Sequence, residues 1–300
     1  MKRLLIVGGS GIIGNSINDY LAKNTYHITS IGRSNKNGGL IIDLLDLDAV
    51  NKFVMNSHLF DIIIFLVGLA HSRGKGKNFS KFKETNVLTL KNLFDALKRF
   101  KKIPDKIIFA STISVYGESF DKNIYNEDTK LNPSSPYAIT KLLAEKYLIN
   151  NYKEISWILR FAPVYSENYL VNINRRTKIA GKYYLVGDGS SKLSLCNMVN
   201  INWAIDGIIN NRILPDIYNI SDPKPYSYCE LLKWQNAKIL FRFPIYFVKL
   251  FYYCGKIFKN NFIKENTIKL ITNNIFPSDK IRSNIDMPTN LFQIKPPIVS

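Results

Sequence analysis

The order of apolar and polar positions changes partway along the chain. Up to about residue 160, short runs rich in Val, Ile and Leu alternate with longer segments whose apolar residues recur at helical spacing. This alternation predicts an α/β fold, a doubly wound parallel sheet (Rossmann) with helices on both faces. We expect strands at 3–7, 27–32, 40–42, 62–67, 106–110 and 156–160, and helices that begin near Ile12, Ala49, Glu84 and Tyr137.

Beyond Phe161 the pattern becomes irregular, with many aromatic residues and prolines. We interpret residues 1–164 as a Rossmann domain that binds a dinucleotide, with a return to the sheet at about 196–222. The smaller C-terminal part, 165–195 and 223–300, is expected to form a substrate-binding domain. No internal repeat or low-complexity segment interrupts this organisation.

The composition excludes several classes of protein. The chain has 300 residues, of which 46% are apolar, and this is enough for a buried core. Its three cysteines show no CxxC pairing and its three histidines no ligand spacing, so we expect a reducing compartment and no metal. The longest apolar run, 62–70, is far below the roughly 20 residues that span a bilayer. We therefore expect a soluble, cytoplasmic protein.

The formal net charge of +18 could indicate nucleic acid, a membrane surface or an anionic small substrate. Lysines are spread along the whole chain beside many Asn and Ile residues, and no compact basic block or nucleic-acid module is present. A general bias in composition explains this pattern best. We therefore expect no nucleic-acid partner.

A glycine-rich turn follows the first expected strand, in the segment LLIVGGSGIIG. Gly8 permits a tight turn, Gly11 lets the backbone approach a pyrophosphate, and Gly14 lets helix and strand pack closely. The start of the following helix, at Ile12 and Ile13, attracts the negative charge of the phosphates. This strand–turn–helix context predicts a dinucleotide site.

The second expected strand ends in SIGRS, without the acidic residue that would bind the adenosine ribose hydroxyls. Arg33 in this segment is suited to pair with a 2′-phosphate, which favours NADP(H) over NAD(H). Asp43 and Leu44 follow the third strand, where an adenine could lie. Val67, at the end of the fourth strand, is a further expected cofactor contact.

Tyr137 and Lys141 lie four residues apart in a helical segment, so they project from one face. A free phenol has a pKa near 10, and a nearby ammonium group favours its ionised form. Such a pair can move a proton to or from a substrate oxygen while a nicotinamide carries hydride. The segment FASTISVYG strengthens this interpretation, because Ser111 and Thr112 follow the fifth strand at the ligand-binding edge of the sheet.

Together these motifs resemble the extended short-chain dehydrogenase/reductase family, in particular its nucleotide-sugar epimerases, dehydratases and reductases. The resemblance covers nearly the whole chain. It is carried by GGSGIIG, ETNVLTLKNLFDAL, STISVYG, PYAITK, LRFAPVYS, GDGSSKLSL and the tail from NTIKL to MPTNL.

The resemblance implies a role for each matching residue. Tyr137 is the general acid-base, Lys141 lowers its pKa and holds the nicotinamide ribose, and Thr112 hydrogen-bonds the reacting oxygen. Ser111 and Ser114 lie beside the substrate. The remaining residues implied are Asn86 in the wall of the cofactor and active site, and either Lys192 or the pair Arg175 and Arg176 at the substrate diphosphate.

Departures from the family pattern bear on the reaction. Dehydratases place an Asp-Glu pair after the active-site Thr, where this chain has Ile113 and Ser114. C4 epimerases usually have an Asn and an Arg at the positions of Pro163 and Leu193. We therefore expect first a reductase of 4-keto nucleotide sugars for surface polysaccharides such as O-antigen, and second an NAD-dependent 4-epimerase. A dinucleotide-binding protein without activity is a third alternative.

The segment FRFPIYFVKLFYYCGKIF, 241–258, is apolar over most of a helix circumference, with Lys249 and Lys256 seven residues apart. It could lie on a membrane surface as a peripheral contact, pack against another subunit, or close over the substrate-binding part. The third alternative is the simplest. The resemblance also implies a homodimer, built from a contact that includes the Tyr137 helix.

Overall fold

The protein is described here by a computed structural model. The structure describes residues 1–300 except 35–37, 71–78, 118, 259 and 298–300, together with the side chains of 261 and 262. The segment GLAHS, 68–72, follows the fourth expected strand, and its last two residues, His71 and Ser72, therefore lie outside the described residues. The chain divides into two compact units, the first made of 1–115, 135–160 and 205–218, and the second of 116–134, 161–204 and 219–300.

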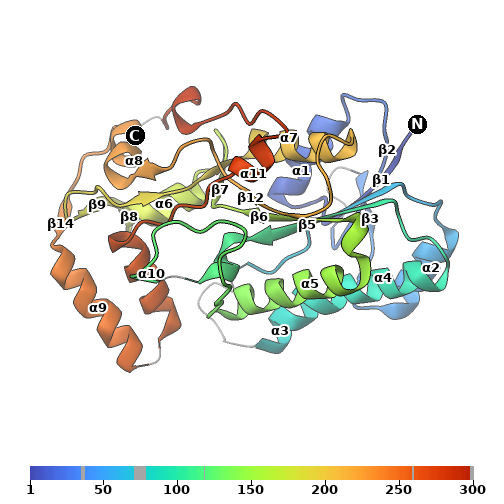
Figure 1. Cartoon of the computed structure of the whole chain (residues 1–300), viewed down its shortest axis with the longest axis horizontal. Helices are drawn as coiled ribbons and strands as arrows, with labels where there is room; N and C mark the ends of the chain where they lie inside the picture. Colours follow the sequence, from blue (N-terminus) through green and yellow to red (C-terminus); the bar gives the residue numbers. More distant parts are fainter. Residues whose placement is uncertain (35–37, 71–78, 118, 259, 298–300) are drawn as a thin grey trace. The chain divides into compact units, whose positions relative to one another are not determined.

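A seven-stranded parallel sheet forms the centre of the fold (Figure 1), which confirms the predicted fold class. The spatial order of the strands is β12-β6-β5-β4-β1-β2-β3. This order reverses next to β1, as in doubly wound sheets, so that the loop after β1 lies at the switch point. The strands are β1 (Arg3–Val7), β2 (His27–Gly32), β3 (Leu40–Ile41), β4 (Ile62–Phe65), β5 (Lys106–Thr112), β6 (Ser156–Phe161) and β12 (Ile217–Ile220).

Helices cover the sheet because its central strands β1, β4 and β5 are apolar on both faces. In Figure 1, α2, α4 and α5 lie on one face and α1 on the other. Val7, Ile63, Phe65, Phe94 and Phe109 are fully buried in the core between the sheet and the first group of helices. The bounds are α1 (Ile12–Leu21), α2 (Leu47–Asn56), α3 (Phe79–Lys83), α4 (Thr89–Arg99) and α5 (Pro136–Tyr152).

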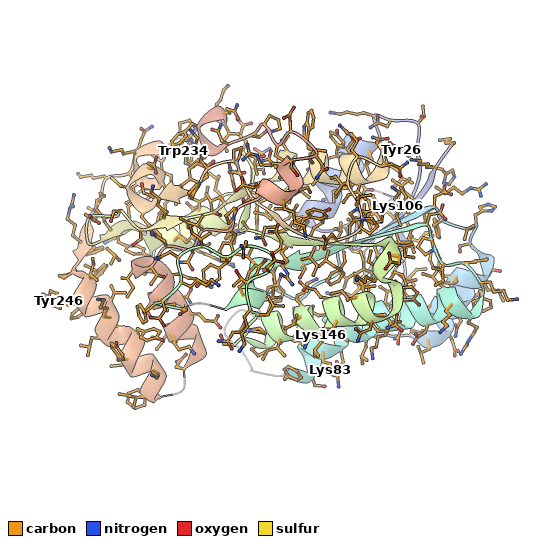
Figure 2. The ribbon with its side chains drawn as sticks, viewed as in Figure 1. Tyr26, Lys83, Lys106, Lys146, Trp234 and Tyr246 are labelled. Atoms are coloured by element: carbon orange, nitrogen blue, oxygen red, sulfur yellow. The ribbon has the colours of Figure 1, made fainter. Side chains whose placement is uncertain are left out.

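The α7 helix (Met198–Ile209) ends beside the amino ends of the strands. Lys106 at the start of β5 donates from Nζ to the carbonyl of Ile208 at 2.6 Å (Figure 2), and Lys2 donates to the carbonyl of Ile209 at 2.7 Å. Ammonium groups interact favourably with the last carbonyls of a helix. These contacts attach the end of α7 to the sheet.

Some element boundaries differ from the predictions. β4 ends at Phe65 rather than residue 67, and β5 continues to Thr112. Where one helix was expected from Glu84, the structure has α3, a π-helical turn at Glu84–Leu88 and then α4. A π-turn holds more residues per turn than an α-helix, and such turns occur often at functional sites.

The second unit consists of short strands and helices. Its core contains Tyr165, Ile173, Leu195, Tyr226 and Leu231, all buried. The elements are β7 (Val164–Tyr165), α6 (Val171–Thr177), β8 (Lys178–Ile179), β9 (Lys182–Val186), β10 (Lys192–Leu193), β11 (Cys196–Asn197), β13 (Tyr226–Ser227), α8 (Tyr228–Trp234), β14 (Phe241–Phe243), α9 (Ile245–Ile257), α10 (Asn261–Ile271) and α11 (Asp279–Arg282). Across the described ranges, no helix combines the length and apolar character needed to cross a membrane.

Candidate active site

The glycine-rich turn connects β1 to α1. Gly8 has φ +87°, a conformation that favours glycine, and its carbonyl accepts a hydrogen bond from the Gly11 amide at 3.1 Å. A Cβ atom on Gly14 would lie 2.6 Å from the Gly8 oxygen and from the Gly9 Cα, so only glycine fits there. Helix α1 has no side-chain cap and no acidic residue in its first turn. The turn therefore offers backbone N–H groups and a positive helix end, as dinucleotide phosphates require.

The other predicted cofactor residues have different environments. Ile12 is exposed and Ile13 is partly exposed at the start of α1, and Arg33 is exposed after β2. The Asp43 carboxylate accepts a hydrogen bond from the Leu45 amide at 3.0 Å. Leu44 is buried in the core under α4, where its carbonyl accepts from Asn92 at 2.9 Å. Their contacts with a cofactor stay predictions.

Thr112 and Tyr137 meet at the carboxyl edge of the sheet. Tyr137 lies in the first turn of α5, which begins at Pro136 and is capped by the Ser135 hydroxyl. Both features favour a helix start at this point. The side chains of Thr112 and Tyr137 are hydrogen-bonded to each other. Burial raises the pKa of Tyr137 to about 12, and the bond with Thr112 opposes this rise. The phenol is therefore protonated at neutral pH.

Lys141 lies one turn further along α5 and is buried, with 3% of its surface exposed. Its Nζ donates to the carbonyl of Ala110 at 2.8 Å and to that of Val67 at 3.1 Å. Burial lowers the pKa of Lys141 to about 7, and the Glu145 carboxylate opposes this change. The lowering of the Tyr137 pKa by Lys141, which the resemblance implies, stays a prediction.

Gly68 lies beside this lysine, a role that was not predicted from the sequence. A Cβ atom on Gly68 would lie 3.1 Å from the Cε and Nζ atoms of Lys141, closer than side chains usually pack. Glycine at this position leaves room for the ammonium group beside the loop that follows β4. Its place one residue after Val67, in the GLAHS segment, was the available signal.

Ser111 belongs to a second, buried hydrogen-bond network next to the site. Its hydroxyl donates to the Glu145 carboxylate, and Arg160 donates from Nε at 3.1 Å and from Nη2 at 2.7 Å to the same carboxylate. All three side chains are buried. The carboxylate thus receives three donors, as a buried charge requires. The predicted substrate contact of Ser111 stays a prediction, and the structure gives its hydroxyl proton an internal acceptor.

Ser114 adjoins Thr112. Its amide donates to the Thr112 hydroxyl at 3.2 Å, and the two hydroxyl oxygens are 3.3 Å apart. This contact places a second hydroxyl next to the one that binds Tyr137. Ser114 is therefore near the predicted reacting oxygen, and its role in substrate binding stays a prediction.

Asn86 lies in the π-helical turn and is fully buried. Its Oδ1 accepts from the Leu69 amide at 2.6 Å, and its Nδ2 donates to the Thr140 hydroxyl at 2.9 Å. Asn86 thereby ties the loop after β4 to helix α5, next to Gly68 and Lys141. Asn86 thus holds together two segments next to the predicted wall of the cofactor site, and its contact with the cofactor stays a prediction.

The three basic residues assigned to the diphosphate belong to the second unit. Arg175 is exposed on α6, and Arg176 on the same helix donates to the carbonyl of Asn172 at 2.8 Å. Lys192 is exposed on β10, which pairs antiparallel with β13. Their contact with substrate stays a prediction.

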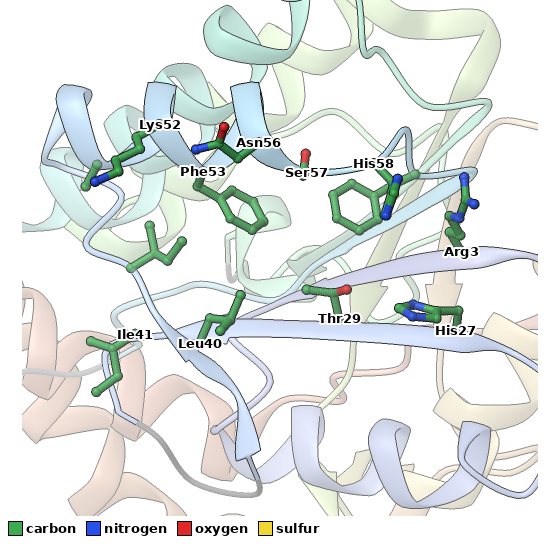
Figure 3. Close-up of a pocket in the computed structure, with 13 residues that line it drawn as sticks. Arg3, His27, Thr29, Leu40, Ile41, Lys52, Phe53, Asn56, Ser57 and His58 are labelled. Carbon is green, nitrogen blue, oxygen red and sulfur yellow. The ribbon is translucent and has the colours of Figure 1, made fainter.

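A cavity of about 470 Å³ lies elsewhere in the first unit (Figure 3). Helix α2 covers it, and its wall includes Arg3 and His27 at the amino ends of β1 and β2. None of the glycine turn, Thr112, Tyr137 and Lys141 lines it. This cavity is therefore separate from the candidate active site.

Comparison with known proteins decides the family. The sequence profile of the NAD dependent epimerase/dehydratase family matches residues 4–221 of the chain. The chain belongs to this family. The resemblance proposed from the motifs is thereby confirmed, and the glycine turn with its uncapped helix fits the family's dinucleotide.

Several members of the epimerase/dehydratase family are similar to the chain. A dTDP-D-glucose 4,6-dehydratase of Dictyostelium discoideum is 27% identical, over 73% of this chain and 58% of its own. A UDP-glucose 4-epimerase of Mycoplasma genitalium is 28% identical, over 49% of this chain and 47% of its own. The chain spans about half the length of the curated relatives that it matches.

A solved structure shows the same fold. The UDP-glucuronic acid 4-epimerase of Bacillus cereus in complex with NAD has a TM-score of 0.70 and 20% identity. The match covers 96% of this chain and 93% of that one. Similarity at this identity supports the fold, and the reaction has to be argued from the site.

Proposed function

We propose that this chain is an NAD(P)-dependent reductase that delivers hydride to the 4-keto group of a nucleotide sugar. The observation that carries this proposal is the hydrogen bond between the side chains of Thr112 and Tyr137 at the carboxyl edge of the sheet, one helical turn from the buried Lys141. A phenol in this position can give its proton to a ketone oxygen as that oxygen is reduced. The absence of the dehydratase Asp-Glu pair at Ile113 and Ser114, and of the epimerase Asn at Pro163, favours reduction over the related reactions.

Each group at the site has its own role in the reduction. The dihydronicotinamide, when bound, would supply the hydride. The Thr112 hydroxyl orients the ketone oxygen, and Tyr137 donates its proton to that oxygen as negative charge develops there. Lys141, held by the carbonyls of Ala110 and Val67, gives a positive charge in the same wall when it is protonated. Its charge stabilises the phenolate that remains.

Arg33 supports NADP(H) as the cofactor, because it is exposed after β2 and no acidic residue stands at that strand end. A guanidinium group pairs well with a 2′-phosphate. Replacing Arg33 with Ser should weaken NADPH binding by about tenfold and leave NADH binding unchanged. Isothermal titration with both cofactors measures this difference, and equal losses would refute the assignment.

A 4-epimerase is the second candidate, and the family comparisons support it. A relative 28% identical to this chain carries the name UDP-glucose 4-epimerase. In that reaction Tyr137 would first accept the proton of the C4 hydroxyl and later return it, while the dinucleotide stays bound. The product class in either case is a nucleotide sugar for surface polysaccharides such as O-antigen. A homodimer and a cytoplasmic location stay predictions from the sequence.

One assay separates the two candidates. Purified protein is incubated with NADPH and a panel of 4-keto-6-deoxy nucleotide sugars, and the consumption of NADPH is followed by its absorbance. The reductase proposal expects stoichiometric conversion of NADPH and ketone. Copurified NAD together with interconversion of UDP-hexoses, without added cofactor, would instead establish the epimerase.

The proton-transfer role has its own test. Tyr137→Phe should lower turnover by at least about a hundredfold while dinucleotide binding is retained. Tyr152→Phe is the matched control, because Tyr152 ends the same helix. Equal turnover of wild type and Tyr137→Phe would exclude proton donation by this phenol.

A further inference from the structure

Helix α9 packs on its neighbours with only a narrow part of its surface. Val248 and Gly255, seven residues apart, are buried. A Cβ atom on Gly255 would lie 3.0 Å from the Lys264 amide nitrogen, so glycine lets α9 and α10 approach closely. Tyr252 packs edge-on against Phe120, with ring centroids 4.7 Å apart. These contacts fix which face of α9 points inward.

The rest of the α9 surface is apolar and exposed. Surface helices usually carry polar residues there, because only one stripe of the helix needs to be buried. Tyr246 is 73% exposed, at the outer side of the molecule in Figure 2, and Ile257 is 75% exposed. We call this surface the α9 face; its large apolar members are Ile245, Tyr246, Phe247, Leu250, Phe251, Tyr253 and Ile257 of the helix and Phe258 at its C-cap.

The charges on the α9 face have one sign. Lys249 and Lys256 are exposed between its apolar residues, and Arg242 is exposed shortly before the helix. The segment 241–258 contains no Asp or Glu. Aromatic and aliphatic side chains interleaved with lysines are typical of helices that lie in the headgroup region of a bilayer. Long lysine side chains reach from such a helix to lipid phosphates.

A second copy of this chain fits the α9 face poorly. A two-fold contact would bring the same patch of both copies together and place lysines of both in one interface. An anionic lipid surface complements both the apolar residues and the charge.

We propose that the α9 face binds the surface of a bilayer containing anionic phospholipid, with the helix lying parallel to the membrane. The 13 residues of α9 extend only about 20 Å, too short to span the bilayer. The apolar side chains enter the region between headgroups and acyl chains, while Lys249 and Lys256 contact phosphates. This attachment is peripheral, and it is independent of the reaction that the first unit catalyses.

The test is sedimentation of the full-length protein with lipid vesicles. The protein should sediment with vesicles of phosphatidylcholine that contain three-tenths phosphatidylglycerol. With vesicles of pure phosphatidylcholine, the amount of protein in the pellet should be at least about tenfold lower. Raising the salt concentration should weaken the binding. The double variant Leu250→Glu/Ile257→Glu should abolish it. Leu214→Glu is the matched control, because Leu214 is equally exposed, at 78%, outside α9.

A second variant tests the charge separately. Lys249→Glu/Lys256→Glu should lose the preference for anionic vesicles, while Lys146→Glu, on exposed α5 surface, should keep it. Thermal unfolding of each variant confirms that it is folded. Failure of wild type to pellet with either vesicle would overturn the proposal. So would a dimer in analytical ultracentrifugation that the α9 variants dissociate, since it would make the face a protein interface.

Discussion

Replacing Lys141 with Met should make the protein more stable at low pH relative to wild type, while it removes the charge from the candidate active site. Lys141 is buried, and burial lowers its pKa from 10.5 to about 7. Below pH 7 both the folded and the unfolded chain hold this proton, so the buried charge destabilises the folded protein fully. Above pH 7 the folded chain releases the proton, and this penalty declines toward pH 10.5.

The two pKa values set the size of the effect. From linkage, the contribution of Lys141 to the free energy of unfolding rises by about 4 kcal/mol between pH 6 and pH 10. The hydrogen bonds from Nζ to Ala110 and Val67 are lost in Lys141→Met at every pH, so they shift the whole curve without changing its slope. The difference in stability between variant and wild type should therefore fall by this amount as pH rises.

Urea unfolding at pH 6, 7, 8, 9 and 10, followed by circular dichroism, measures the two stability curves. Lys146→Met is the control, because Lys146 is exposed on the same helix (Figure 2). Its curve should run parallel to that of wild type. A Lys141→Met curve that is also parallel to wild type would show that the buried ammonium keeps its ordinary pKa, and would refute the reasoning.

Two further predictions concern the supporting structure. Gly14→Ala should destabilise the protein by about 2 kcal/mol or more and weaken dinucleotide binding, because the new methyl group meets the Gly8 oxygen and the Gly9 Cα. Urea unfolding measures the loss of stability, and titration with NADPH measures the loss of affinity. Retained affinity in a folded Gly14→Ala protein would contradict the role given to the turn. Glu145→Gln should destabilise by about 3 kcal/mol or more, because it leaves Arg160 buried without a negative partner. An unchanged urea midpoint would contradict the importance of that ion pair.

The central strands β1, β4, β5 and β6 could be predicted from the sequence because they are buried on both faces and read as apolar runs. The bounds of β2 also agree with the predicted range, although most of its residues are only half-buried. β4 was predicted too long, because Leu66 and Val67 are apolar but already belong to the loop that leads to Gly68. Apolar character alone does not distinguish a strand from a loop packed beneath a helix.

The site was predictable where spacing alone fixes geometry. Tyr137 and Lys141 share a helix face, and Gly8, Gly11 and Gly14 sit where one strand and one helix meet. The burial of Lys141, and with it the low pKa, depends on how β4, β5 and α5 pack. The Glu145–Arg160 pair joins two residues 15 positions apart in the chain, one in α5 and one in β6. Glu145 lies one turn after Lys141, so its position was visible in the sequence, but its partner was not.

The π-helical turn at Glu84–Leu88 holds one residue more than a regular helix would need over the same rotation. Removing one residue from the turn would allow α3 and α4 to continue as one regular helix. Phe82 would keep its buried face, because the wider turn and the α-helical turn that replaces it rotate the chain by about the same angle. The change would fall on the turn itself, where Asn86 binds the Leu69 amide and the Thr140 hydroxyl. The extra residue therefore serves the placement of Asn86 and leaves the packing of α3 unchanged.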